Sequence, residues 1–175
     1  TKKLILNKIK SLDVIITSGG ISKSKTDNIG KFFEINAQIK FWRLSIKPGR
    51  PFAFGKIKNT PFIGLPGNPV AAIITFFMLV IDYIKALSGL KEKQTIERIL
   101  PCDFEMKKRK GRTEWLRGMI IKKKKSYFLT KFSSTGSGII SSISQSHGII
   151  ELDEKKEYIK KGTFLKFYRY EDMLN

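Results

Sequence analysis

Apolar residues follow different patterns in the two halves of the chain. In residues 1–88, short apolar runs alternate with segments whose apolar residues have helical spacing. The pattern predicts strands at Asp13–Thr17, Phe41–Ile46, Phe52–Ile57 and Phe62–Leu65, and helices at Lys3–Ser11, Asn28–Asn36 and from Pro69 to Gly89. Lys58-Asn59-Thr60 is predicted to form the turn of a hairpin between the last two strands. This alternation is typical of an α/β layer structure.

The second half reads as short strands separated by charged turns. A polar connector at 89–97 precedes strands predicted at Ile99–Met106, Thr113–Ile121, Tyr127–Phe132, Gly148–Leu152 and Thr163–Tyr168. Such a series predicts a small all-β unit, either a barrel or a sandwich. We therefore expect an α/β domain at 1–88, a linker at 89–97 and a β domain at 98–175.

One long apolar run, Val70 to Ile81, is interrupted by Thr75 and followed by Asp82. It is shorter than the roughly 20 residues that cross a bilayer, so we predict no membrane partner. The run is apolar on every side of a helix, which predicts burial on more than one side, by the core or by a subunit interface.

Composition is that of a soluble globular protein, with 41% hydrophobic and 28% charged residues. Cys102 is the only cysteine, which excludes an internal disulfide framework and fits a reducing cytoplasm, the predicted location. We interpret Cys102 as a small, partly buried residue after Pro101 rather than a nucleophile. His147 is the only histidine, which argues against a histidine-based zinc site.

The net charge of +19 has two interpretations. It could attract a polyanion, or it could reflect lysines spread over solvated faces. Lysine outnumbers arginine, and the densest runs, Lys107–Lys110 and Lys122–Lys125, fall at predicted turns. No RNA-binding aromatic signature or zinc-finger spacing is present. We favour solvated lysines and predict no specific nucleic-acid partner.

Three glycine- and proline-containing loops follow or lie between the predicted strands, where α/β sheets bind their ligands. Ser18-Gly19-Gly20 can bring backbone N–H groups close to an anion, although an ordinary strand-to-helix turn could have the same sequence. Lys47 and Arg50 bracket Pro48-Gly49 and can bind an oxyanion, although a solvated turn would have the same composition. In Pro66-Gly67-Asn68-Pro69, glycine and asparagine shape a turn and Pro69 begins a helix. Together the loops predict a pocket for an anionic small molecule.

Asp27 closes the first loop. A carboxylate beside a phosphate site repels the ligand unless a cation lies between them, so Asp27 is a candidate Mg²⁺ ligand. The alternative is a helix N-cap before Asn28.

In this order, the three loops resemble the molybdenumtransferase family of molybdenum-cofactor synthesis, which includes bacterial MoeA and the E domain of gephyrin. The matching stretches are Ser18–Asp27, Lys47–Pro51 and Gly64–Ala71, and Trp115–Gly118 and Gly136–Ser142 resemble patches of the family's C-terminal domain. The resemblance implies the C-terminal part of a three-layer α/β/α molybdopterin-binding domain, followed by the small β domain. It further implies that the chain is the C-terminal portion of a longer, homodimeric protein.

The resemblance implies a transferase that inserts molybdate into adenylylated molybdopterin and releases AMP, with Mg²⁺ as cofactor. The implied catalytic residues are Asp27, also the metal ligand, Lys47 and Pro66. The implied substrate-binding residues are Ser18, Gly19, Gly20, Ser22, Arg50, Gly67, Asn68, Pro69, Arg117 and Ser137.

The chain departs from the family pattern at several positions. Lys23, Ser24 and Lys25 replace small and acidic residues, Arg50 replaces lysine, and Ala71 replaces serine. Two alternatives therefore stay open: a molybdopterin adenylyltransferase of the related fold, which has no all-β tail, and a non-catalytic binding or scaffolding module.

Overall fold

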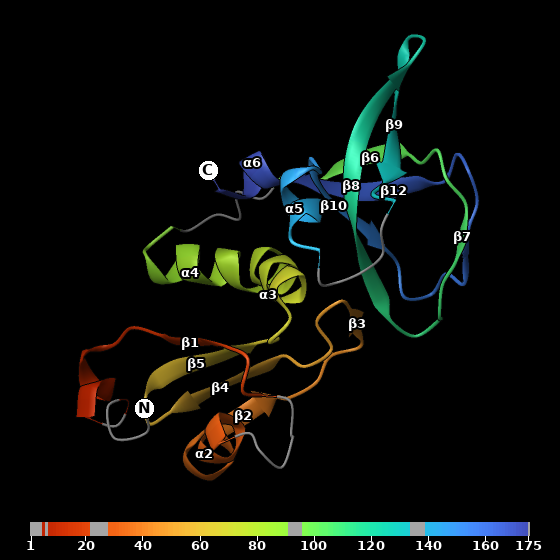
Figure 1. Cartoon of the computed structure of the whole chain (residues 1–175). Coiled ribbons are helices and arrows are strands. Elements are labelled where there is room, and N and C mark those ends of the chain that lie inside the picture. The colour runs from red at the N-terminus through yellow and green to blue at the C-terminus, as the bar shows by residue number, and fades with distance from the viewer. Residues whose placement is uncertain (1–4, 6, 22–27, 91–95, 134–138, 175) are drawn as a thin grey trace.

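The computed structural model (Figure 1) describes residues 5, 7–21, 28–90, 96–133 and 139–174. Two β-sheets lie on opposite sides of one long helix. The first sheet comes from the N-terminal half and the second mainly from the C-terminal half.

The first sheet has four strands in the order β1-β5-β4-β2. β1 is parallel to β5, whereas β4 is antiparallel to both β5 and β2. The N-terminal elements are η1 (Ile9–Ser11), β1 (Ile15–Ser18), α2 (Asn28–Asn36), β2 (Gln38–Phe41), β3 (Ile46–Lys47), β4 (Ala53–Ile57) and β5 (Thr60–Leu65). The predicted hairpin between β4 and β5 is confirmed, with Lys58 at φ 53° in its turn.

Helices cover both faces of this sheet. On one face, Phe33 of α2 stacks on Phe62 of β5 with ring centroids 3.5 Å apart. On the other face, Ile63 packs in a cluster with Ala72 and Val80 of the long helix. The result is the three-layer α/β/α arrangement predicted from the sequence.

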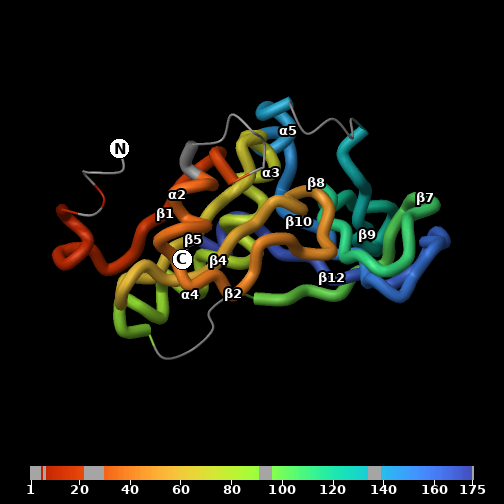
Figure 2. The backbone as a smooth tube through the Cα atoms, turned by 90° about the horizontal axis from the view of Figure 1, so that it is seen from below, coloured from red at the N-terminus to blue at the C-terminus, as the bar shows by residue number. Residues whose placement is uncertain are grey.

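The long helix consists of α3 (Pro69–Thr75), a π-helical turn η2 (Phe76–Val80) and α4 (Ile81–Leu87). Opposite the first sheet, Val70 and Ile74 pack with Trp115, Ile149 and Tyr168 of the second; in both views α3 lies beside β10 (Figures 1 and 2). Among the described helices, only these 19 residues are long and apolar enough to cross a membrane. Packing on both sides accounts for the apolar composition of α3 and confirms the predicted burial there. Within the same predicted run, Phe76 to Leu79 of η2 are only half-buried.

The second sheet has the order β3-β8-β10-β12-β6, with β9 paired to β8, and β7 pairs separately with β11. Its elements are β6 (Arg98–Pro101), β7 (Met106–Lys107), β8 (Thr113–Lys123), β9 (Ser126–Lys131), α5 (Ser141–Ser144), β10 (Gly148–Leu152), β11 (Tyr158–Ile159), β12 (Phe164–Arg169) and α6 (Tyr170–Leu174). The strands curl until Cys102 reaches Leu129 through one isolated bridge. One bridge is not a ladder, so this unit is not a closed barrel and is sandwich-like. Cys102 is fully buried, more deeply than the partial burial predicted from the sequence.

Two predicted strands were wrong in extent. The strand predicted at Phe41–Ile46 is two short strands, β2 and β3, because the chain leaves the first sheet after Phe41 and pairs in parallel with β8 of the second. The strand predicted at Ile99–Met106 is divided because Cys102 and Phe104 turn into the core. The N-terminal half therefore contributes one short strand to the second sheet.

Candidate functional site

The first and third predicted loops lie side by side. Ser18 and Leu65 are register partners at the carboxyl ends of parallel strands β1 and β5. The Gly19 N–H donates to the Leu65 carbonyl at 3.0 Å, and the Ser18 hydroxyl donates to the Pro66 carbonyl at 3.4 Å. A Cβ atom at Gly19, where φ is +81°, would lie 3.5 Å from the Cα of Gly67. The two loops therefore lie in contact at the same edge of the first sheet, at the carboxyl ends of β1 and β5.

The turn before α3 is shaped by its own side chains. The Asn68 side chain accepts a hydrogen bond from the Ala71 N–H at 3.2 Å, and Pro69 occupies the first turn, where no N–H is needed. Asn68 is therefore the N-cap of the long helix.

The second loop rests directly on the long helix. Gly49 has φ +101°, and a Cβ atom there would lie 2.1 Å from Thr75 Cγ2. Only glycine fits both this conformation and this approach. The Arg50 carbonyl accepts hydrogen bonds from the N–H groups of Leu44 and Phe52 at 3.2 and 3.1 Å, which closes the turn.

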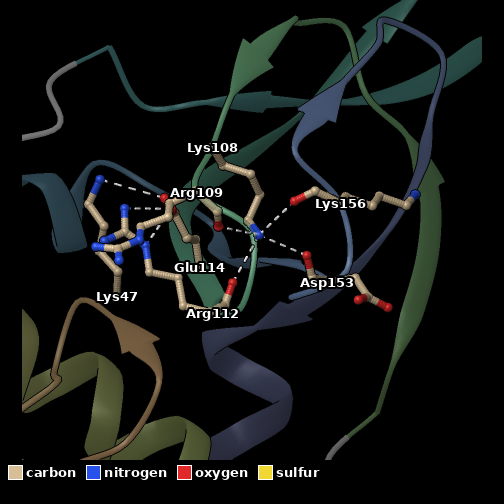
Figure 3. Close-up of polar contacts among 7 residues, drawn as sticks. All are labelled: Lys47, Lys108, Arg109, Arg112, Glu114, Asp153 and Lys156. Carbon is tan, nitrogen blue, oxygen red and sulfur yellow. Dashed lines mark hydrogen bonds and ion pairs between the residues drawn. The ribbon is translucent and has the colours of Figure 1, made fainter.

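Lys47 joins the two halves of the chain. Its strand β3 pairs in parallel with β8, and Lys47 lies opposite Glu114 in that register. Lys47 Nζ lies 3.5 Å from Glu114 Oε2, and Arg112 Nε and an Arg112 terminal nitrogen lie 2.9 and 2.8 Å from Glu114 Oε1 (Figure 3). The Glu114 side chain is only 1% exposed. A buried carboxylate therefore fixes one cation from each half.

These loops surround a cavity of about 830 Å³ between the two sheets. Its lining includes seven cationic side chains and one carboxylate, that of Glu114. The cations are Lys47, Arg50, Arg109, Lys110, Arg112, Arg117 and Lys131. Such an excess of positive charge in a concave site favours an anionic ligand.

Arg117 is the most buried of these cations, with 6% of the residue exposed. Burial lowers the pKa of its guanidinium, and the phenol of Tyr170 acts in the opposite direction. A guanidinium stays charged at neutral pH even so. Burying a charge costs free energy, and an anion in the cavity would offset this cost for Arg117. Arg117 therefore favours the binding of an anion.

The structure brings most of the predicted site residues together. Lys47, Arg50, Pro66, Gly67, Asn68 and Arg117 line the cavity. Ser18 and Gly19 lie beside it, through their contacts with Pro66 and Gly67, and Gly20 follows at φ 74°. Pro69 sits behind Asn68 at the helix start. Ser22, Asp27 and Ser137 lie outside the described residues.

The loop at 108–112 contributes to the site although its sequence does not indicate this. The run Lys107–Lys110 has the composition of a solvated turn, which is the wrong interpretation here, because Arg109 and Lys110 line the cavity and Lys108 is buried. Glu114 was missed as well. Its position one residue before the Trp115–Gly118 patch was the signal that could have indicated it. The second basic run does lie at the β8–β9 turn, as predicted.

Within the described ranges, no group of three or more His, Cys, Asp or Glu residues could hold a metal ion. Mg²⁺ commonly takes only one or two carboxylates, and substrate phosphates complete its shell. Asp27, the candidate ligand named from the sequence, lies outside the described residues, so its metal role stays a prediction.

Comparison with known proteins covers both halves of the chain. Residues 1–86 match the model described as a probable molybdopterin binding domain, and residues 100–170 match the MoeA C-terminal region, domain IV. The chain is 34% identical over 164 residues to the molybdopterin molybdenumtransferase of Haemophilus influenzae, covering 93% of this chain and 41% of that protein. It is 29% identical over 191 residues to gephyrin of Dictyostelium discoideum, covering 94% of this chain and 26% of that protein.

A solved structure of a molybdopterin biosynthesis MoeA protein from Pyrococcus horikoshii has the same fold. It superposes with a TM-score of 0.76 at 24% identity, over 96% of this chain and 40% of that one. The chain thus spans less than half the length of these relatives. With both of its halves matched and three loop motifs in place, the chain belongs to the MoeA family of molybdenum-cofactor biosynthesis proteins, of which it carries the molybdopterin-binding and C-terminal regions.

Proposed function

We propose that the protein inserts molybdate into adenylylated molybdopterin during molybdenum-cofactor synthesis. The observation that carries this proposal is the cavity between the two sheets, where seven cations face one carboxylate. The reaction brings together two anionic substrates, and a cationic cavity lowers the repulsion between them. The names of the matched relatives support the same activity.

In this reaction the two dithiolene sulfurs bind molybdenum, one oxo ligand leaves with the two thiol protons as water, and hydrolysis of the phosphoanhydride releases AMP. No protein nucleophile is needed. Catalysis comes from proximity and from a fixed electrostatic environment. Molybdate and the adenylylated pterin are the proposed substrates.

The residues have separate proposed roles. Lys47, Arg50 and Arg117 bind the oxyanion, and Pro66 holds the adjoining wall. Gly67, Asn68 and Pro69 shape the turn against which the pterin lies. Ser18, Gly19, Gly20 and Ser22 bind phosphate, and Ser137 contributes a hydroxyl at the rim. Asp27 would hold a Mg²⁺ ion, whose charge would neutralise the substrate phosphates. Such an assembly would work in the cytoplasm as a homodimer, without nucleic-acid or membrane partners.

An adenylyltransferase of the related fold is a weaker candidate. Five of the cavity's seven cations come from the C-terminal half, which that fold lacks: Arg109, Lys110, Arg112, Arg117 and Lys131. A scaffolding module would bind the anions without turnover.

The test combines the purified protein with adenylylated molybdopterin, Mg²⁺ and molybdate, and measures AMP release and protein-bound molybdenum. AMP release that depends on molybdate supports the proposal. Adenylylation of molybdopterin from ATP would identify the adenylyltransferase instead, and anion binding without AMP release would identify the scaffolding module.

A further inference from the structure

Lys108 is a buried lysine whose ammonium group is surrounded by backbone carbonyls. Its Nζ donates to the carbonyls of Arg109 and Arg112 at 3.2 and 2.9 Å, within its own loop. It also donates to the carbonyls of Asp153 and Lys156 at 2.9 and 3.0 Å, in the loop before β11 (Figure 3). An ammonium group has three protons, so these four acceptors saturate it. Lys108 therefore ties two loops together and has no donor left for a ligand.

Backbone hydrogen bonds fix the same loop at further points. The Lys108 N–H donates to the Glu157 carbonyl at 2.8 Å, and the Gly111 N–H donates to the Glu154 carbonyl at 2.9 Å. The Thr113 N–H donates to the Ser45 carbonyl at 3.0 Å, which joins the end of the loop to the turn that carries Lys47. The loop at 108–112 thus has one defined shape before any ligand arrives.

This fixed loop presents cations to the cavity. Arg109, Lys110 and Arg112 all line it. Arg112 is engaged by Glu114. In the part of the chain that the structure describes, no carboxylate forms an ion pair with Arg109 or Lys110. Two charges on a rigid loop are therefore available to a ligand.

We propose that the loop at 108–112 is a second anion subsite of the cavity, in which Arg109 and Lys110 bind a phosphate group of the substrate and Lys108 is the positioning residue. The inference rests on the proposed function, which needs sites for two anions. Lys47, Arg50 and Arg117 serve the oxyanion. The phosphoanhydride of the adenylylated pterin has two phosphate groups: the first loop, with Ser18, Gly19, Gly20 and Ser22, serves one, and the loop at 108–112 serves the other. A guanidinium binds phosphate oxygens in a bidentate manner, and a loop already in place loses little freedom on binding.

Titration calorimetry of the purified protein with molybdate, inorganic pyrophosphate and AMP, each separately, tests the subsite. Arg109→Gln is expected to weaken pyrophosphate and AMP binding about tenfold, the loss typical of one charged hydrogen bond, and to change molybdate binding less than about twofold. Lys125→Met, at the distant β8–β9 turn, removes one charge as a control and is expected to leave all three affinities unchanged. Unchanged pyrophosphate and AMP affinities in Arg109→Gln would overturn the subsite.

A second variant tests the positioning role. Lys108→Met keeps an unbranched side chain of nearly the same length but loses the ammonium group and its four hydrogen bonds, so the loop loses its shape. Pyrophosphate affinity is expected to fall about tenfold although Lys108 does not touch the ligand. Adding Arg109→Gln to Lys108→Met is expected to cause less than about twofold further loss, because both act on one site. Full additivity, or an equal loss of molybdate affinity, would contradict the positioning role.

These outcomes separate the inference from the proposed function. A protein that binds both anions at separable sites yet inserts no molybdate keeps the subsite and loses the function. A protein that inserts molybdate while Arg109→Gln leaves pyrophosphate and AMP binding unchanged keeps the function and loses the subsite.

Discussion

Lys47 and Glu114 are register partners across the junction of the two halves, and their charged groups lie 3.5 Å apart. Lys47 ends a two-residue strand that leaves the first half to pair with β8. The Lys47 side chain is half-exposed, whereas the Glu114 side chain is buried. The same carboxylate holds Arg112. The position of a cation in the second predicted loop therefore depends on a residue 67 positions further along the chain.

Replacing Lys47 with methionine is expected to weaken molybdate binding about tenfold or more, because a charged hydrogen bond to the oxyanion is lost. The fold should persist, since Arg112 still pairs with Glu114. Calorimetric titration with molybdate is the measurement. Lys40→Met, on exposed β2, is the matched control. Equal affinities for the two variants would remove Lys47 from the oxyanion site.

Replacing Glu114 with glutamine should act mainly on stability. The substitution keeps the shape of a buried side chain but removes the charge that pairs with Lys47 and Arg112. Because both partners are partly exposed, we expect a loss of about 1–3 kcal/mol in the free energy of unfolding. Urea unfolding measures it. Anion affinity should not decrease, since the cavity becomes more positive; a tenfold decrease would show that the carboxylate is needed to orient the cations.

Gly49→Ala tests the contact between the second loop and the long helix. The new Cβ would lie 2.1 Å from Thr75 Cγ2, on a backbone with φ +101°. We expect a loss of roughly 2–4 kcal/mol in the free energy of unfolding. Gly162→Ala is the matched control, because its φ is +85° but no atom lies within 4 Å of the added Cβ; it should lose only about 1 kcal/mol.

Thr75→Ser distinguishes the two possible causes of the stability loss in Gly49→Ala, which are backbone strain and the contact with Thr75 Cγ2. Serine removes Cγ2 and keeps the hydroxyl that donates to the Ala71 and Ala72 carbonyls. The double variant Gly49→Ala/Thr75→Ser should therefore be more stable than Gly49→Ala alone. If it is not, strain in the backbone and not the contact explains the loss.

Asp27→Asn tests the proposed metal site. Asparagine keeps the capping oxygen but loses the charge, so it separates Mg²⁺ binding from helix capping. We expect molybdate-dependent AMP release to disappear from the full-length protein, with the melting temperature unchanged and the adenylylated pterin still bound. Normal AMP release would remove Asp27 from the site.

Stability should depend on pH through Asp103. A hydrogen bond from Lys123, followed by one from Lys161, lowers the pKa of this carboxyl. A lowered pKa means that the stabilisation is complete above the ordinary carboxyl pKa of about 4 and is lost as pH falls through the folded value. Asp103→Asn should therefore reduce the melting temperature more at pH 7 than at pH 2. An equal reduction at both pH values would exclude the ion pairs as its cause.

Local patterns predicted the loops of the site well. Apolar runs and turn residues were sufficient to place Ser18-Gly19-Gly20 and Pro66–Pro69, because each follows its own strand. β1 and β5 are parallel neighbours, and their pairing brings Gly19 close to Gly67. This agrees with the general rule that α/β sheets bind ligands at the carboxyl ends of their strands.

Contacts between distant parts of the chain were not predictable in this way. The run Lys107–Lys110 has the composition of a solvated turn, and burial of Lys108 depends on carbonyls more than 40 residues away. The crossing of β3 onto β8 was hidden by the apolar residues from Phe41 to Ile46, which resemble one strand. Such choices are decided by tertiary packing and not by local preference.

The helix from Pro69 to Leu87 contributes side chains to two cores at once, and this limits how the chain can be divided. A cut in the connector at 89–97 would deprive the second sheet of Val70 and Ile74 and uncover Trp115 and Ile149. A cut before Pro69 would uncover Ile63 instead. Neither fragment keeps a complete interior, so the two halves should melt in one cooperative transition whose midpoint rises when an anion binds between them. The smallest segment that can fold by itself, and that recombination could therefore move between proteins, contains both sheets.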